Sequence, residues 1–260
     1  MEWSRVKSIL ICVFVAVNIF LIAVYIKGST TEITVDAQTV SNTVTVLKNN
    51  NISVDKSLIP TKSSDMPVFN ITSAKPSVSE YAAVLWKNAK ANGGDYFNSD
   101  YCKTENDTVT YTAAEQGTIA DVKKNIKKTG ILDKFNYRCS ETEESLEYKI
   151  VFDNCSVEDI WVKASLSGGT VTVTAKNCLG GTVSEAGYCT VKTAPEILIS
   201  FASAIKPKNP VKIVSMEKAY IAGSRSGEIR TVTVSPVWKI TAADNAVYYI
   251  DMRNGDLLSV

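Results

Sequence analysis

The chain has 260 residues, with 28 Lys and Arg against 27 Asp and Glu, and it contains no histidine. The absence of histidine excludes Ser-His-Asp and Cys-His catalysis, His-ligated zinc and an imidazole pH switch. The charge is nearly balanced, and no basic stretch is interleaved with aromatic residues, so the sequence argues against nucleic-acid binding. It also offers no phosphate-cradling loop and no metal-ligand motif, and we expect neither a cofactor nor enzymatic activity.

The N-terminus predicts a membrane anchor. A charged head over residues 1–8 precedes 18 residues without a charge, 9–26. As a helix this run is about 27 Å long, enough to cross the hydrocarbon core of a bilayer. A cleaved signal peptide is the alternative, but this run is longer than a signal core and ends in bulky side chains. Arg5 and Lys7 precede the span and Lys27 alone follows it, which favours a cytoplasmic N-terminus and an extracytoplasmic C-terminal domain.

The predicted span carries one patterned face. Spacings of 3, 4, 3 and 4 place five residues together: Ile11, Phe14, Asn18, Leu21 and Tyr25. An Asn in mid-span can stabilise helix association in lipid by about 0.6–2 kcal/mol through hydrogen bonds between helices. In the alternative, Asn18 bonds only carbonyls of its own helix. We predict that this face binds a partner helix in the membrane.

The region after the anchor is predicted to be an α+β exterior with a net charge of −1, because three basic residues and one acidic residue lie up to Lys27. We expect antiparallel sheets with helices on one face, in two similar lobes. The first segment would cover residues 29–75 and the main domain residues 76–260, with the boundary near 72–77. Apolar periodicity predicts helices over 36–49, 77–92 and 118–128, and a further helix that starts at Ala194-Pro195. Strands are predicted near 52–54, 68–71 and 109–112 and in the last fifty residues, with an antiparallel meander over 146–175. The polar and turn-forming residues of 62–67 predict a loop.

Cysteine usage leaves two interpretations open. Cys12 lies in the predicted span, and five cysteines follow it: Cys102, Cys139, Cys155, Cys178 and Cys189. Cys178 and Cys189 bracket a Gly-rich stretch, and a disulfide between them would stabilise the fold by roughly 3 kcal/mol. Alternatively, all five are reduced apolar residues in strands.

Two groups of carboxylates resemble sites but have simpler explanations. Glu141, Glu143, Glu144 and Glu147 lack the surrounding pattern of a calcium loop, so we expect a solvated acidic loop. Asp251 and Asp256 flank Asn254-Gly255, a hairpin turn signal, which favours turn residues over a glycosidase pair.

Both ends of the chain resemble a known family. The residues that carry the resemblance are Glu2-Trp3-Ser4, Lys7, Phe14, Asn18, Phe20 and Leu21; Asp36-Ala37-Gln38-Thr39-Val40, Val44, Leu47-Lys48, Ile52-Ser53-Val54 and Ile59-Pro60; and Pro236-Val237-Trp238-Lys239-Ile240, Tyr248-Tyr249-Ile250 and Asn254-Gly255-Asp256-Leu257. They resemble YycI proteins, membrane-anchored accessory regulators of the YycG (WalK) sensor histidine kinase of Gram-positive bacteria. The resemblance implies closing strands similar to PepSY-type sheets, and as partners a YycG-like kinase and a YycH-like protein.

Together with the predicted anchor, this resemblance implies a membrane-anchored regulator of a two-component system linked to cell wall homeostasis, which acts through helix contacts in the membrane and contacts outside it. The first alternative is a surface module that binds a small ligand or wall fragment. A surface hydrolase that uses paired carboxylates is the second.

Overall fold

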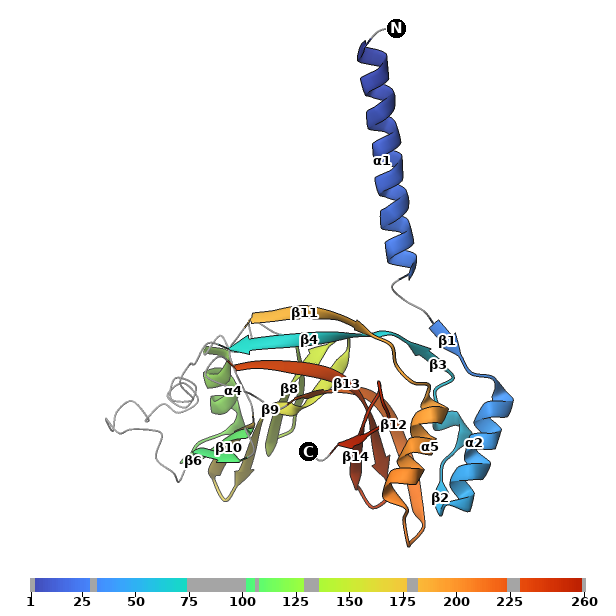
Figure 1. Cartoon of the computed structure of the whole chain (residues 1–260). Helices are drawn as coiled ribbons and strands as arrows, with labels where there is room; N and C mark the ends of the chain where they lie inside the picture. The colour runs from blue at the N-terminus through green and yellow to red at the C-terminus, as the bar shows by residue number, and fades with distance from the viewer. Residues whose placement is uncertain are drawn as a thin grey trace.

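The chain forms an α+β structure in which an N-terminal helix precedes a large mixed, mostly antiparallel sheet (Figure 1). The structure is a computed structural model, drawn in Figure 1. It describes residues 3–28, 32–73, 102–105, 108–128, 136–176, 182–223 and 230–258. The helix predicted over 77–92 lies outside these residues. The α+β class expected from the sequence is confirmed.

The N-terminal part of the chain contributes two helices and the first strands. They are α1 (Trp3–Gly28), β1 (Glu32–Thr34), α2 (Ala37–Asn49), β2 (Ile52–Ser53), a 3-10 turn (Lys56–Leu58), β3 (Lys62–Ser64) and β4 (Met66–Ser73). Asp36 caps α2, because its carboxylate accepts a 2.7 Å hydrogen bond from the Thr39 amide. Asn51, just past the helix end, takes the left-handed conformation at φ 59°. The predicted helix over 36–49 is therefore confirmed.

The loop predicted over 62–67 is wrong. Residues 62–64 form β3, which pairs antiparallel with β1, and Met66 begins β4. Ser63, in the centre of β3, is almost completely buried. The backbone partners of β3 are distant in the chain, so its polar local sequence contains no signal for them.

The middle of the chain folds into a smaller lobe: β5 (Cys102–Glu105), β6 (Thr108–Gln116), α4 (Ile119–Lys128), β7 (Tyr137–Glu141), β8 (Ser145–Phe152), β9 (Cys155–Ser167) and β10 (Thr170–Lys176). The predicted meander is confirmed, with tight turns at Asp153-Asn154 and Gly168-Gly169. All four turn residues have positive φ, which is why Asn, Asp and Gly stand there. The predicted helix over 118–128 is confirmed as α4. It covers a small core of aliphatic residues and Tyr148.

The C-terminal part completes the large sheet: β11 (Thr182–Cys189), α5 (Ala194–Ile205), β12 (Val211–Ala222), β13 (Arg230–Ala242), β14 (Val247–Asp251) and β15 (Leu257–Leu258). The strand order is β11-β4-β13-β12-β9-β10-β6-β5, with β14 also on β13 and β8 on β9. Most pairs are antiparallel, whereas β12 pairs in parallel with β2 and with β9. The strand-rich C-terminus expected from the sequence is confirmed.

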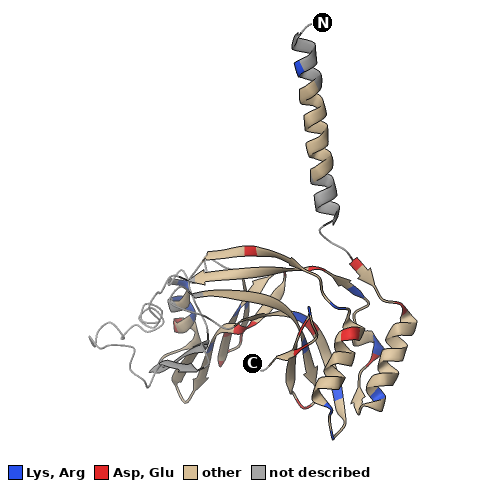
Figure 2. Cartoon of the chain, in the orientation of Figure 1, with Lys and Arg blue, Asp and Glu red and all other residues tan. Residues whose placement is uncertain are grey.

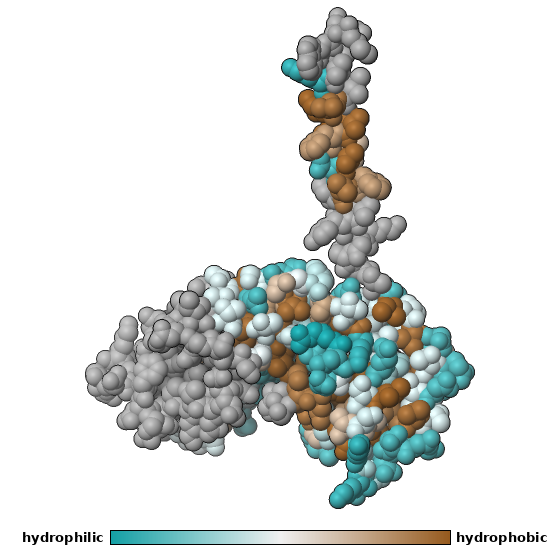
Figure 3. Space-filling view, viewed as in Figure 1, coloured by the Kyte–Doolittle hydropathy of each residue, from teal (hydrophilic) through white to brown (hydrophobic). Residues whose placement is uncertain are grey.

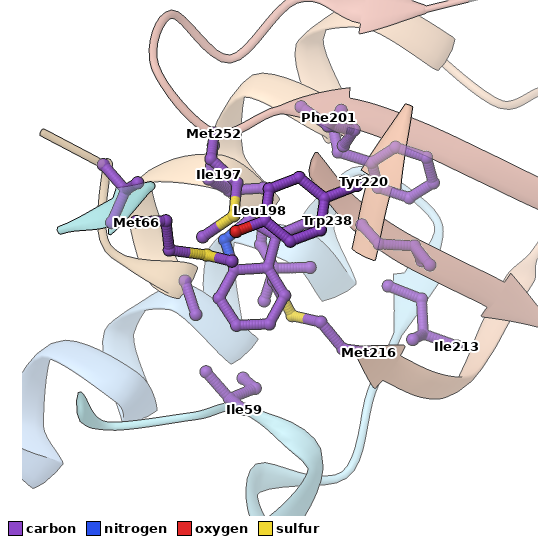
Figure 4. Close-up of a cluster of buried hydrophobic side chains, with 14 of the residues drawn as sticks. Ile59, Met66, Ile197, Leu198, Phe201, Ile213, Met216, Tyr220, Trp238 and Met252 are labelled. Atoms are coloured by element: carbon purple, nitrogen blue, oxygen red, sulfur yellow. The ribbon is translucent and has the colours of Figure 1, made fainter. Parts of the chain in front are cut away.

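The main core lies between the large sheet and the helices α2 and α5. Figure 4 shows Trp238, Tyr220 and Phe201 packed among aliphatic side chains and the methionines Met66 and Met216. Trp238 is 1% exposed, as expected for an apolar strand residue. The Tyr220 hydroxyl donates a 3.1 Å hydrogen bond to the Pro67 carbonyl, which ties β12 to β4.

Strand β9 connects the smaller lobe to the main body, by which we mean β1 to β4, α2, α5 and β11 to β15. At its start, Val157 pairs in parallel with Tyr220 of β12, and its later residues pair with β8 and β10. Phe69, Phe152 and Tyr220 form an aromatic cluster beside this crossing, with Phe69 and Phe152 stacked at 4.4 Å between ring centroids. The domain boundary predicted near 72–77 adjoins undescribed residues and stays a prediction, and β4 on its near side is already paired with β11 and β13.

Candidate functional site

Helix α1 extends away from the sheets and exposes apolar side chains (Figures 1 and 3). Three residues of the predicted partner face, Ile11, Phe14 and Leu21, are 56–69% exposed. The Tyr25 side chain lies outside the described residues. Exposure is not limited to the predicted face, because Leu10 and Phe20 are exposed to the same degree.

Asn18 forms a hydrogen bond to a carbonyl of its own helix, which was the alternative to a contact with a partner helix. Its Nδ2 donates to the carbonyl of Phe14, one turn earlier, at 2.8 Å. One N–H of the amide is thus satisfied within the helix. The side-chain oxygen Oδ1 can still accept a hydrogen bond from a second helix, so the partner-face prediction is not tested by this contact.

Over the residues that the structure describes, no helix has the length and apolar content of a membrane span. The side chains described in α1 are those of Lys7 and of residues 10–21. The membrane anchor over 9–26 and its orientation stay predictions.

The structure does not test the predicted disulfide between Cys178 and Cys189. Cys189 is a free thiol in the structure, and Cys178 lies outside the described residues. Cys155 is also free, and burial raises the pKa values of both Cys155 and Cys189. A raised pKa leaves little thiolate at neutral pH, so neither thiol is activated as a nucleophile.

A second site, which the sequence analysis did not find, surrounds the carboxylate of Glu158 on β9. Lys149 of β8 and Lys239 of β13 each place Nζ 3.0 Å from the same oxygen, Oε2. Ser156 donates to Oε1 at 2.6 Å, and the Tyr249 hydroxyl of β14 lies 3.4 Å from Oε2. We call these five residues the Glu158 cluster. It joins strands of the smaller lobe to strands of the main body.

The Glu158 cluster holds its carboxylate in the ionised form. Burial by itself raises the pKa of Glu158, but hydrogen bonds from Ser156 and Lys149 and the nearby lysine charges outweigh it and lower the pKa to about 2. The pKa of Tyr249 is raised, first by burial and then by the adjacent negative charge of Glu158. Glu158 is therefore a fixed anion at neutral pH and cannot serve as a general acid.

The neighbourhood of the cluster carries further charges. Glu147 lies 3.8 Å from Lys149 and 3.1 Å from Lys163, whose ammonium is also 4.7 Å from the centre of the Trp161 ring. Asp159 accepts a 2.9 Å hydrogen bond from the Ala222 amide on β12. Charged side chains of both signs thus follow the strands around β9.

Four of the carboxylates noted in the sequence have side-chain partners: Glu141, Glu147, Asp251 and Asp256. The predicted acidic loop is wrong at two of its positions, because Glu141 ends β7 and Glu147 lies in β8. Glu141 forms an ion pair with Lys123 of α4. Asp251 is buried and accepts from Arg253 through Nε and Nη2, at 2.5 Å to Nη2. Burial raises the pKa of Asp251, but these hydrogen bonds outweigh it and lower the pKa. Asp256 bonds Asn254 in the turn. Among the described residues, no group of three or more Cys, Asp or Glu side chains is arranged to hold a metal ion.

Comparisons with known proteins yield matches among solved structures only. No family model matches the chain, and no curated protein matches it. The chain is similar to a solved structure of an uncharacterized protein from Eubacterium rectale ATCC 33656, with 9% sequence identity and a TM-score of 0.43, over 85% of this chain and 98% of that chain. The resemblance to YycI proteins stays a prediction that rests on the residues quoted above.

Proposed function

We propose that this chain is a membrane-anchored accessory regulator of a sensor histidine kinase, with α1 packed against the membrane helices of the kinase. The observation that carries the proposal is the exposure of apolar side chains along α1. Nine large hydrophobic residues between 10 and 21 are 48–70% exposed. A continuous apolar surface of this kind is stable when lipid or a partner covers it.

The charge distribution along α1 supports a bilayer as its surroundings. Lys7 stands near the N-terminal end, and residues 10–21 carry no charge (Figure 2). In the sequence the uncharged run extends over 9–26, long enough to cross the hydrocarbon core. We place the N-terminus in the cytoplasm and the α+β body outside, since Arg5 and Lys7 outnumber Lys27.

Asn18 gives the proposed helix contact its direction. The amide already donates to the Phe14 carbonyl, and its oxygen is the group that would accept from a kinase helix. Such a hydrogen bond favours one rotation of α1 against its partner, with Ile11, Phe14 and Leu21 packed beside it. Signalling states of a kinase differ by small helix shifts, so a preference of about 1.4 kcal/mol for one state changes the population ratio tenfold.

The α+β body would act outside the membrane in this proposal. The connection between α1 and β1 is short, because α1 ends at Gly28 and β1 begins at Glu32. The body is thereby held within a few residues of the membrane surface, where a YycH-like protein or the exterior of the kinase can contact it. The chain itself performs no chemistry in this role.

The test is copurification of the full-length protein from native membranes after crosslinking in intact cells. We compare wild type, Asn18→Leu and the matched control Cys12→Leu, which changes an exposed residue of α1 outside the predicted face. We expect a histidine kinase with wild type and Cys12→Leu, and at least a fivefold loss with Asn18→Leu. Equal recovery with all three variants contradicts the role of Asn18, and the absence of any kinase contradicts the regulatory function.

A further inference from the structure

We propose that Lys149 and Lys239 of the Glu158 cluster form a binding site for an oxyanion, a phosphate or carboxylate group of a ligand. The site lies in the α+β body, far along the chain from α1, and it is independent of the kinase contact proposed above. The proposal rests on the placement of the two ammonium groups, on their unused donors and on the local charge.

The geometry brings two cations close together without a second anion between them. Both Nζ atoms lie 3.0 Å from Oε2 of Glu158, so they are no more than twice that distance apart. Each ammonium has three N–H donors, and one from each points to Glu158. The lysine side chains are 20% and 23% exposed, whereas that of Glu158 is 3% exposed. The carboxylate is thus enclosed, whereas each lysine side chain is partly exposed and keeps N–H donors that Glu158 does not use.

The charge of the Glu158 cluster itself favours an added anion. One carboxylate contacts two ammonium groups, which leaves one positive charge within the Glu158 cluster. Glu147 is 3.8 Å from Lys149 but closer to Lys163, which it pairs at 3.1 Å. With Asp159, whose charge also raises the pKa of Tyr249, the wider neighbourhood is balanced, so the positive charge is confined to the cluster itself. An oxyanion can accept charge-assisted hydrogen bonds of about 2.8 Å from both ammonium groups, because the two Nζ atoms lie on the same oxygen of Glu158 and are therefore close to each other.

The cluster is also held in place before any ligand arrives. Ser156 and Tyr249 hold the Glu158 carboxylate from two further directions, and the carboxylate fixes both lysine ends. Ordering two long side chains in advance removes much of the entropy cost that a ligand would otherwise meet. Because Lys149 belongs to β8 and Lys239 to β13, a bound oxyanion adds a second bridge between the smaller lobe and the main body.

The test is titration of the full chain with inorganic phosphate, in nanodiscs of phosphatidylcholine, at constant ionic strength maintained with chloride. We expect saturable binding by calorimetry and a matching rise of the thermal midpoint. Lys149→Gln weakens binding about tenfold, and Lys149→Gln with Lys239→Gln abolishes it. Lys212→Gln is the matched control, an exposed lysine on β12 that contacts neither Glu158 nor Glu147, and it binds as wild type does.

Glu158→Gln separates an anion site from a merely structural ion cluster. Removing the carboxylate charge raises the local positive charge, so phosphate binds several-fold more tightly to this variant, even though the variant is less stable. Nanodiscs that contain phosphatidylglycerol identify the source of the oxyanion: competition with phosphate indicates a lipid headgroup, and unchanged affinity indicates a soluble ligand. The proposal is overturned if wild type shows no saturable binding, or if Lys149→Gln binds as wild type does.

Discussion

The main core and the small core both consist of a helix layer packed on a sheet, but the main core collects residues that are far apart in the chain and the small core collects residues that are close together. The main core combines β4, β12, β13 and β14 with α2 and α5, so its contacts join residues from both ends of the body. The small core uses one continuous segment, from Ile119 in α4 to Val173 in β10. Large aromatic side chains fill the former, and aliphatic residues dominate the latter. A core made of local contacts can open while the remainder stays folded, whereas the long-range core governs global unfolding.

The largest effect is expected from emptying the main core. Phe201 on α5 is completely buried and meets Tyr248 at 5.1 Å between ring centroids. Phe201→Ala should cost about 3–5 kcal/mol through lost burial and a residual cavity. In thermal unfolding of the full chain in mild detergent, each kcal/mol lowers the midpoint by about 2–4 °C. Ile199→Ala, on the exposed side of the same helix, serves as the control and should leave the midpoint nearly unchanged.

The matched change in the small core separates the two regions. Ile126 on α4 is also completely buried. Ile126→Ala should speed hydrogen exchange in α4, β8 and β10, while amides of β13 and β14 keep their protection. Phe201→Ala should instead speed exchange throughout the body. Equal loss of protection everywhere in both variants would show that the cores unfold as one unit.

A smaller effect is expected at the junction between these cores. Glu158→Gln keeps the shape of the side chain but removes the anion that Lys149 and Lys239 face. The loss should be about 1–3 kcal/mol, the usual range for hydrogen bonds to charged groups. The pKa of Glu158 is about 2 in the fold and 4.5 ordinarily. The carboxylate therefore contributes stability above about pH 4.5, and this contribution is lost as the pH falls toward 2.

The pH dependence supplies the check on this prediction. Thermal midpoints of wild type and Glu158→Gln, measured from pH 7 down to pH 2.5, should differ most at pH 7 and converge at the acid end. Lys212→Gln removes an exposed charge on β12 that faces no carboxylate of the cluster, and it should leave the midpoint close to that of wild type at every pH. A constant gap between wild type and Glu158→Gln would show that ionisation of Glu158 does not stabilise the fold.

Local signals explain which parts of the fold the sequence could predict. Asp36 is the N-cap of α2, and Pro195 lies in the first turn of α5. The turns at 153–154 and 168–169 separate the strands of the meander. Each of these signals acts within a few residues of itself. Strand β3 has no such signal, because its structure depends on pairing with β1, and a polar stretch beside Pro67 is typical of a loop.

The Glu158 cluster could not be predicted for the same reason. The lysines and the tyrosine that meet Glu158 stand 9, 81 and 91 positions away in the chain. Only the register of β8 and the paths of β13 and β14 bring them together. The face of α1 is the opposite case: its periodicity is fully visible in the sequence, but the partner proposed for it lies outside this chain.

The smallest expected effects come from two similar helix caps, one in each region. At α5 the Glu196 carboxylate accepts from the amide and the hydroxyl of Thr193, at 2.8 and 2.7 Å. At α4 the Asp121 carboxylate accepts from the amide and the hydroxyl of Thr118, at 3.2 and 2.8 Å. Both pairs have the spacing Thr-x-x-acid, which is a sequence signature of a helix N-terminus.

Replacing either threonine by alanine should cost about 1 kcal/mol, because the hydrogen bond from its hydroxyl to the carboxylate in the first turn of the helix is lost. The same chemical loss should appear in different places, since α5 belongs to the long-range core and α4 to the local one. Thr193→Ala should lower the global midpoint by a few degrees. Thr118→Ala should leave the midpoint unchanged and speed hydrogen exchange in α4 alone, with Thr45→Ala on the exposed side of α2 as the control. If Thr118→Ala lowers the global midpoint as much as Thr193→Ala does, then the smaller lobe does not open independently, and the distinction between the two cores fails.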